Sequence, residues 1–363
     1  MISYNEIKEI HLELATECNA ACPQCPRNFN GYTHNGGYPE TYMTLKQAKH
    51  IFNPEFLKQL REIVVNGNFG DIMMNPDTPE IVEYFREHNE SLRIIISTNA
   101  GARPKEFWQR LAKAQCKVLF CLDGLEDTHH LYRQNTRYQT VIKNALTFIG
   151  AGGNAVWKCI KFKHNEHQIE EMRQLSVDFG FKSFDLIDHG RDTGPVFNDN
   201  KELTHILGNY NGPTDFHTMF VDQRSESRTI DNTEWQFDPE VEDIKITCDT
   251  VINNRIYVAA TGEISPCCFT GFYPETFGKN SYTEPLNAQL KELISKNNAL
   301  EHDIETCIKW FNGFTDLWKK KSYKDGRLLV CDEFCGKGCG SADEMVLGRD
   351  SRKETKHINT TTT

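Results

Sequence analysis

The first 190 residues repeat one pattern, in which a short apolar segment is followed by a polar turn and an amphipathic segment with helical spacing. Apolar segments of strand length occur at 10–14, 62–67, 93–99, 117–123, 156–162 and 183–188. Several of them are continuous apolar runs, which is typical of parallel strands covered by helices. Strands that alternate with helices predict right-handed βαβ units and a parallel sheet. Six units are too few for a closed barrel of eight, so we expect an α/β fold built as a partial (βα)6 barrel.

The amphipathic segments carry the start and stop signals of helices. Thr78 is the expected N-cap of one helix, and Pro79 is its expected first residue. Gly150 and Gly180 are expected to end two later helices. Ligands of parallel α/β folds bind beyond the carboxyl ends of the strands. The turns that follow the strands are therefore the places where we expect functional residues.

The composition is that of a globular protein in a reducing compartment. The chain has 363 residues, 38% of them hydrophobic, and it contains no run of 18 apolar residues that could span a membrane. The first ten residues lack the basic and apolar regions of a secretory signal, so we expect a cytoplasmic location. There, closely spaced cysteines are more often metal ligands or catalytic groups than disulfides, and the chain has 13 cysteines. The formal net charge of −10 argues against a nucleic-acid partner.

The strand–helix pattern stops near residue 192, and the chain is predicted to divide there. Residues 1–192 would form the partial barrel. Residues 193–240 are polar and rich in Asp, Asn, Gly and Pro, and they are interpreted as a linker with at most one short helix. A second, smaller module is expected at 241–345, and residues 346–363 form a polar tail.

Three cysteines, Cys18, Cys22 and Cys25, stand directly after the first predicted strand. A disulfide would leave one thiol over. A structural zinc site needs four ligands, and the nearest candidates for a fourth, His11 and His34, have no recognised spacing. A cluster of four irons held by three thiols would leave one iron open to a substrate.

The spacing C-x3-C-x2-C after the first strand of a six-unit α/β domain resembles the radical S-adenosylmethionine (radical SAM) superfamily. The resemblance implies that Cys18, Cys22 and Cys25 hold a [4Fe–4S] cluster and that S-adenosylmethionine chelates its fourth iron. It further implies reductive cleavage of S-adenosylmethionine to a 5′-deoxyadenosyl radical that abstracts hydrogen from a substrate.

Further residues match the cofactor-binding segments of that superfamily. The resemblance places the S-adenosylmethionine amino group at the end of the second strand and polar contacts at the ends of the next two strands. One departure is Gln24, which stands where many members have an aromatic residue before the third cysteine. The implied cofactor-binding residues are Gln24, Gly70, Asp71, Ser97, Thr98, Asn99 and Asp123.

The second module contains another group of cysteines. Cys248 and Cys267 flank a segment with the pattern of a β-hairpin, with Thr261 and Gly262 at its turn. A hairpin would bring these two cysteines to one end. The run "CDEFCGKGCG" follows much later, at 331–340.

These segments resemble the C-terminal auxiliary-cluster module called SPASM in its full form and twitch in its shorter form. The C-x2-C-x5-C-x3-C run of the full form is absent, so the shorter form with one extra cluster fits better. The resemblance implies a second [4Fe–4S] cluster held by Cys248, Cys267, Cys331 and Cys335, with Cys339 as an alternative to Cys335. A structural zinc site is the other interpretation. Because a small cysteine-rich module has little core of its own, we expect its stability to depend on its metal.

The resemblance says more about the initiating chemistry than about the substrate. It implies a peptide or small-molecule substrate, a net oxidation or cross-link supported by the auxiliary cluster, and an electron donor such as a flavodoxin or ferredoxin. The sequence shows no leader-peptide-binding extension before residue 8, which favours a small molecule or a mature peptide. Asp188, His189 and Arg191 follow the sixth strand and are candidates for substrate contact or proton removal.

A non-enzymatic function is the alternative. The chain would then hold two zinc ions and bind an acidic or nucleic-acid partner through the basic run 318–327. Metal content separates the two interpretations, because an iron–sulfur protein is brown and a zinc protein is colourless.

Overall fold

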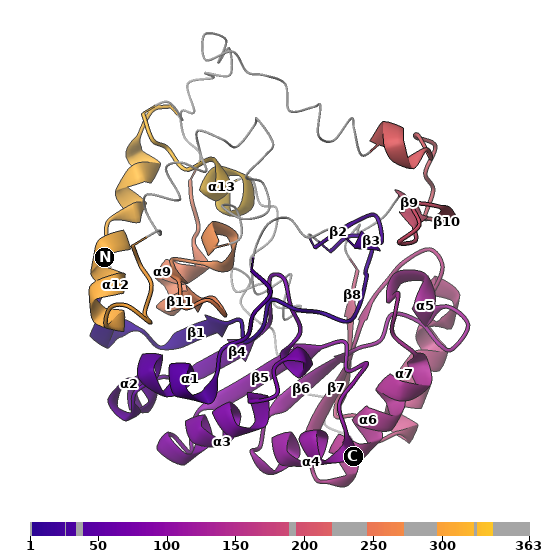
Figure 1. The fold of residues 1–363 in the computed structure, drawn as a ribbon, viewed down its shortest axis with the longest axis horizontal. Helices are drawn as coiled ribbons and strands as arrows, with labels where there is room; N and C mark the ends of the chain where they lie inside the picture. Colours follow the sequence, from indigo (N-terminus) through magenta and orange to yellow (C-terminus); the bar gives the residue numbers. More distant parts are fainter. Residues whose placement is uncertain are drawn as a thin grey trace, which may run out of the picture.

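The computed structural model describes residues 2–25, 27–33, 39–188, 194–219, 245–271, 296–322 and 325–336, and Figure 1 shows their fold. His34, His189, Arg191 and Cys339 lie outside these ranges, as does the predicted tail. No helix in the described ranges is long and apolar enough to cross a membrane.

The described residues form one large, mostly parallel sheet of eight strands in the order β12-β11-β1-β4-β5-β6-β7-β8. Its strands are β1 (Glu9–Leu12), β4 (Glu62–Val65), β5 (Arg93–Thr98), β6 (Lys117–Cys121), β7 (Asn154–Ile160), β8 (Ser183–Ile187), β11 (Arg255–Val258) and β12 (Ile264–Ser265). All six strands expected from apolar runs are present, as β1 and β4 to β8, and they pair in parallel. Within the described residues the sheet ends at β12 and β8 without closing, so the predicted α/β partial-barrel class is confirmed.

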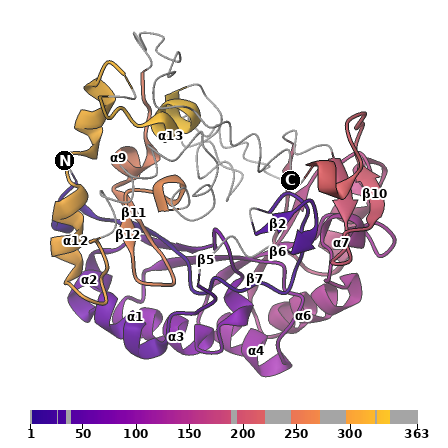
Figure 2. The same ribbon diagram turned by 45° about the horizontal axis from the view of Figure 1, so that its top comes forward.

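Helices run along the outer, convex side of this sheet (Figures 1 and 2). The α-helices are α1 (Leu45–Ile51), α2 (Pro54–Gln59), α3 (Thr78–His88), α4 (Lys105–Lys113), α5 (His129–Tyr132), α6 (Tyr138–Gly150), α7 (Ile169–Asp178), α9 (Asp249–Asn253), α12 (Ile304–Phe311) and α13 (Leu329–Cys331). Short 3-10 turns are η1 (Tyr4–Glu6), η2 (Ile72–Met74), η3 (Glu166–Gln168) and η4 (Phe314–Lys319), and η5 (Asp332–Gly336) is a π turn.

The two faces of the sheet bury different residues, because successive side chains of a strand point to opposite faces. Ile63 and Val65 of β4 belong to the large core beneath the outer helices. Val64, between them, packs instead with Ile95 and Leu119 in a separate cluster on the inner face. This alternation tells which residues of each strand face the side opposite the helices.

The start of α3 differs from the sequence prediction. Thr78 is its first residue, and Asp77 precedes it. The Thr78 hydroxyl donates a hydrogen bond to Ile72 O at 2.7 Å, and Asp77 Oδ2 accepts one from Leu45 N at 2.9 Å. Both side chains tie the helix to neighbouring segments instead of capping it. The predicted end of α6 at Gly150 is confirmed.

The predicted linker contains two strands that the sequence analysis missed. β9 (Gly194–Phe197) and β10 (Leu203–Leu207) pair as an antiparallel ribbon. Most of β10 is exposed, so no apolar run marks it. Phe197 and Phe216 pack together with ring centroids 5.2 Å apart, near the short ribbon of β2 (Asn28–Phe29) and β3 (Tyr32–Thr33).

The hairpin of β11 and β12 is present as predicted, with Gly262 at a positive φ of 94° in its turn. Its place in the fold was not predicted, because β11 pairs in parallel with β1 and so extends the main sheet. Ile256, Val258 and Ile264 are buried in the large core. The hairpin therefore shares the large hydrophobic core, so the premise that it has little core to rest on was wrong. Whether its stability depends on metal stays a prediction.

Buried charges fix β11 to β1. Arg255 Nε donates a hydrogen bond to Glu9 Oε2 at 3.0 Å, and Glu9 also pairs with Arg61. Glu62 of β4 pairs with Arg93 at 3.0 Å. A buried charge is stable only when it is paired, so these ion pairs favour this register over others.

Candidate active site

The cysteine loop, residues 16–25, crosses the carboxyl end of the sheet where the chain leaves β1. Cys22 is buried, and Cys18 and Cys25 are half-buried. All three belong to one cluster with Ile160 and Ile187, which end β7 and β8. The structure thus gathers the three thiols over the edge of the sheet where parallel α/β folds bind their ligands.

The donor set of this loop consists of three thiols. Among the described residues, no three His, Cys, Asp or Glu side chains are arranged to hold one metal ion. A four-iron cluster is a larger body and takes thiolate ligands. His11, considered above as a fourth zinc ligand, has its Nε2 atom 2.7 Å from Asn66 O and is engaged there.

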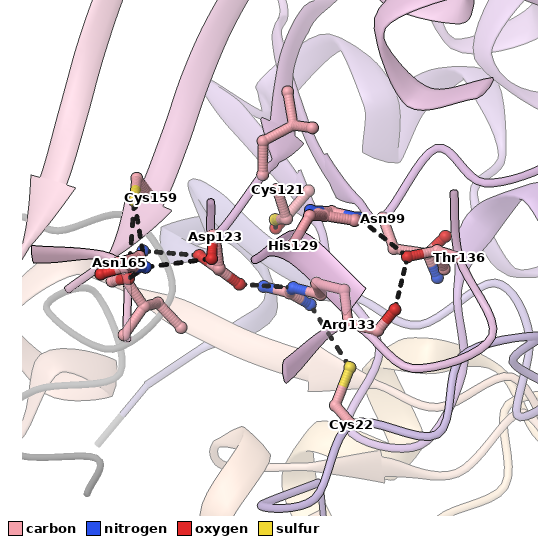
Figure 3. Close-up of polar contacts among 12 residues, drawn as sticks. Cys22, Asn99, Cys121, Asp123, His129, Arg133, Thr136, Cys159 and Asn165 are labelled. Carbon is pink, nitrogen blue, oxygen red and sulfur yellow. Dashed lines mark hydrogen bonds and ion pairs between the residues drawn. The ribbon is translucent and has the colours of Figure 1, made fainter. Parts of the chain in front are cut away.

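Burial raises the pKa of two of the three thiols. It raises the pKa of Cys22 to about 11, and it raises the pKa of Cys18 further. Arg133 opposes the shift at Cys22, because its guanidinium lies 3.7 Å from Cys22 Sγ (Figure 3). Since the thiolate is the form that binds metal, Arg133 favours the metal-binding form of Cys22.

Asp123 holds Arg133 in place. Arg133 Nε donates to Asp123 Oδ2 at 2.5 Å (Figure 3). Ile160 N donates to Asp123 Oδ1 at 2.6 Å. Asn165 Nδ2 donates to the Asp123 carbonyl at 3.0 Å. Asp123 is fully buried, so removing either partner of this ion pair would leave an uncompensated buried charge. A direct contact of Asp123 with a cofactor stays a prediction. The observed contacts show that Asp123 positions the Arg133 side chain.

Asp71 joins the ends of β4 and β5. The Thr98 hydroxyl donates to Asp71 Oδ1 at 2.6 Å, Asn99 N donates to Oδ2 at 2.7 Å, and Met73 N donates to Oδ1 at 3.2 Å. Burial raises the pKa of Asp71, and these hydrogen bonds lower it. A carboxylate has about four lone-pair sites. The described donors occupy three of them, which leaves one lone-pair site on Oδ2 without a described donor.

Gly70 and Asn99 bring this carboxylate to the cysteine loop. A Cβ atom at Gly70 would lie 2.6 Å from Glu17 O and closer still to Ala15 O. Asn99 Nδ2 lies 3.5 Å from Cys18 Sγ and donates to Asn19 Oδ1 at 3.1 Å. The predicted residues Gly70, Asp71, Thr98 and Asn99 therefore meet beside the first cysteine.

Three other predicted residues lie apart from this point. Ser97 lies on the inner face of β5, where its hydroxyl is 3.5 Å from Cys121 Sγ, and Gln24 is exposed. Asp188, a candidate for substrate contact or proton removal, lies at the surface. Its side chain is 64% exposed and pairs with Lys161 at 2.7 Å, because it follows an inward residue and so points the other way. The roles assigned to Ser97, Gln24 and Asp188 stay predictions.

The late cysteines gather beyond the hairpin. A hydrogen bond with Cys335 lowers the pKa of Cys248 to about 7. The charge of Cys267 acts on both Cys331 and Cys335 and raises the pKa of each. Thr247 N donates to Cys335 O at 3.1 Å and holds the two segments together. The four thiols predicted to be auxiliary ligands are thus neighbours in the structure.

The sequence analysis missed Glu13. Its carboxylate is 1% exposed and accepts hydrogen bonds from Phe69 N at 2.8 Å and Gly70 N at 3.2 Å. The Tyr257 hydroxyl donates to its other oxygen at 2.8 Å. Burial raises the pKa of Glu13 to about 7. An acidic residue inside the apolar run "IHLEL" was the available signal, since a buried carboxylate requires partners.

Solved structures show what this arrangement is similar to. Streptococcus suis SuiB bound to S-adenosylmethionine matches with a TM-score of 0.50 and 16% identity, over 90% of this chain and 77% of SuiB. A second structure of Streptococcus suis SuiB matches with a TM-score of 0.50 and 15% identity, again over 90% of this chain and 77% of SuiB. SuiB is a radical SAM enzyme.

This chain has the same α/β fold as SuiB. No protein-family model matches the sequence, and no curated protein matches it either. At 16% identity, the likeness to SuiB concerns the fold alone, so the chemistry must be argued from the residues of this chain.

Proposed function

We propose that this chain is a radical SAM enzyme whose cysteine loop holds a [4Fe–4S] cluster. When bound, the cluster would supply the electron that cleaves S-adenosylmethionine and so starts hydrogen abstraction from a substrate. The observation that carries the proposal is the meeting of Cys18, Cys22 and Cys25 with Asp71 and Asn99 at the carboxyl end of the sheet. The radical SAM fold supports it.

The chain's own residues would bind and orient the cofactor. Asp71 would accept a hydrogen bond from the ammonium group of S-adenosylmethionine at its remaining lone pair. Asn99 would keep the strand end beside Cys18, and Arg133 would favour the thiolate of Cys22. The apolar cluster around the cysteine loop would exclude water from the cofactor.

We further propose that Cys248, Cys267, Cys331 and Cys335 hold an auxiliary [4Fe–4S] cluster. Their mutual proximity supports this assignment. A second cluster would accept the electron left on the substrate after hydrogen abstraction, which suits a net oxidation or a cross-link. A carrier such as a flavodoxin or ferredoxin would deliver the first electron.

The substrate would be a peptide or a small molecule bound on the inner face of the sheet, since helices cover the outer face. The inner face of the sheet carries polar residues among apolar ones. Strand register places Lys158 beside Cys121 and Asp185. These side chains would contact polar groups of the substrate near the site where hydrogen is abstracted.

The decisive experiment is anaerobic purification followed by iron analysis and an assay for 5′-deoxyadenosine with S-adenosylmethionine and dithionite. Cys22→Ala should lose the first cluster and all cleavage, because two thiolates cannot place the open iron. Cys116→Ala is the matched control, since Cys116 is also buried but lies in the core beneath the helices. Cleavage that survives in Cys22→Ala, or a colourless wild-type protein with stoichiometric zinc, would contradict the proposal.

A further inference from the structure

The loop that follows β4, residues 66–71, carries Gly70 and Asp71 and is held by groups from distant parts of the chain. Two of its backbone N–H groups donate to Glu13, which lies beyond the end of β1. Tyr257 of the hairpin donates its hydroxyl to the same carboxylate. We call residues 66–71 the β4 loop.

A second contact ties the β4 loop to the auxiliary segment. Asn68 Nδ2 donates a hydrogen bond to Cys268 O at 3.0 Å. Cys268 directly follows Cys267, one of the proposed auxiliary ligands. The β4 loop is thus linked to the hairpin strand through Glu13, and it directly contacts the segment that leaves the hairpin.

The Tyr257 hydroxyl matters because the Glu13 carboxylate is buried. Both side chains are only 1% exposed. Oε1 of Glu13 accepts the two loop N–H groups, and Oε2 accepts the tyrosine hydroxyl. A buried polar atom that loses its partner is unfavourable, so without the hydroxyl the carboxylate would turn or protonate. Either change would weaken its hold on the loop.

We propose that the C-terminal hairpin is part of the S-adenosylmethionine site, because Tyr257 acts through Glu13 to hold the β4 loop in its binding conformation. Tyr257 is a positioning residue in this sense and touches no cofactor. The inference rests on the proposed function for the identity of the ligand. It extends that function by making S-adenosylmethionine affinity depend on the auxiliary module.

Tyr257→Phe removes the hydroxyl and keeps the ring, so it tests the hydrogen bond to Glu13 apart from the packing of the ring. The ring packs edge-on against His11 with centroids 5.3 Å apart, and phenylalanine keeps this contact. Tyr84→Phe is the matched control, since the buried Tyr84 also donates its hydroxyl, to Phe52 O at 2.9 Å, but stands on α3. Asn68→Ala is a second test variant, which removes the contact with Cys268.

The first measurement is amide hydrogen exchange of the full-length protein, which needs no turnover. In Tyr257→Phe we expect faster exchange in peptides that cover the β4 loop, and in Tyr84→Phe we expect the wild-type rate there. The second measurement is S-adenosylmethionine binding to the anaerobically purified protein. We expect about tenfold weaker binding in Tyr257→Phe, which corresponds to about 1.4 kcal/mol, with unchanged iron content. Asn68→Ala should change both readouts in the same direction.

Each outcome decides the inference. Unchanged loop exchange in Tyr257→Phe overturns it, and so does faster exchange with unchanged affinity. If the wild-type protein binds no S-adenosylmethionine, the proposed function fails instead. The exchange data would then still show whether the hairpin holds the β4 loop.

Discussion

The Asp71 carboxylate has two roles: it joins two strand ends, and we propose that it also binds the cofactor. It joins two strand ends through three hydrogen bonds, and one lone pair is left for a ligand. An aspartate with a purely structural role would also accept hydrogen bonds from backbone N–H groups, so its position alone does not distinguish the two roles. A substitution that keeps the shape of the side chain and removes its charge distinguishes them.

Asp71→Asn should raise the S-adenosylmethionine concentration needed for half-maximal cleavage by about 10- to 100-fold. The lost charge-assisted hydrogen bond is worth about 1.5–3 kcal/mol. Asp77→Asn is the control, because Asp77 also accepts a backbone N–H, from Leu45, but lies at the start of α3. Equal affinities of Asp71→Asn and wild type would show that Asp71 only joins the strands.

Glu13 should make folding stability depend on pH. Its folded pKa of about 7 lies above the value of about 4.3 for an unfolded glutamate. The folded state therefore holds the proton more tightly, and the stabilisation is present in full below about pH 4 and lost as the pH rises through 7. Over that window the wild type should lose roughly 3 kcal/mol relative to Glu13→Gln.

Urea unfolding of both proteins at several pH values between 4 and 8 measures this difference. Glutamine keeps an oxygen that can accept from Phe69 N and Gly70 N, so the loop contact is retained while the titration is removed. Parallel stability curves for the two proteins would show that Glu13 does not titrate in this window.

At the scale of elements, the β4 loop depends on the absence of a side chain. The close approach of Gly70 to Ala15 O and Glu17 O joins the β4 loop to the chain that leads into the cysteine loop. Both obstructing atoms belong to the backbone, so no side-chain rotation can relieve a clash there.

Gly70→Ala should displace the β4 loop, and Asp71 with it. We expect S-adenosylmethionine binding to weaken by more than about tenfold, while most iron remains because the cysteines lie on a different loop. Gly150→Ala is the control, since a Cβ atom there would meet nothing within 4 Å. Iron content and S-adenosylmethionine affinity of both variants are the measurements, and wild-type affinity in Gly70→Ala would show that the loop tolerates the shift.

The same elements show what could be read from sequence. β4 to β7 can be predicted from apolar runs, because strands buried on both faces consist of locally continuous apolar residues. The spacing of the cysteine loop is local as well. β10 was missed because it lies exposed at an edge and is fixed by its pairing with β9, and the pairing of β11 with β1 joins residues such as Glu9 and Arg255 that are 246 positions apart. The partners of Asp71 and Glu13 are non-local in the same way, and no local pattern specifies them.

At the scale of the whole molecule, one continuous sheet connects the two cysteine groups: the cysteine loop follows β1, and Cys248 and Cys267 flank the hairpin of β11 and β12. The hairpin is fixed at its start by the buried Arg255–Glu9 pair and at Tyr257 by Glu13. The segment before Cys331 is fixed by another buried pair, since Arg327 donates to Asp332 at 2.5 Å. All of these contacts are made by protein side chains alone.

Removing auxiliary thiols should therefore remove the auxiliary cluster and leave the first cluster in a folded chain. We expect the double variant Cys248→Ala with Cys267→Ala to lose about half of roughly eight irons per chain and to keep the first cluster. Its hairpin should stay folded, because Ile256, Val258 and Ile264 remain in the core. Cleavage of S-adenosylmethionine should persist at a reduced level, since the β4 loop keeps Glu13 and Tyr257 but its contact with Cys268 is disturbed. Iron analysis, thermal unfolding and 5′-deoxyadenosine formation measure these three effects separately, and a double variant that keeps all its iron would show that the late cysteines hold no cluster.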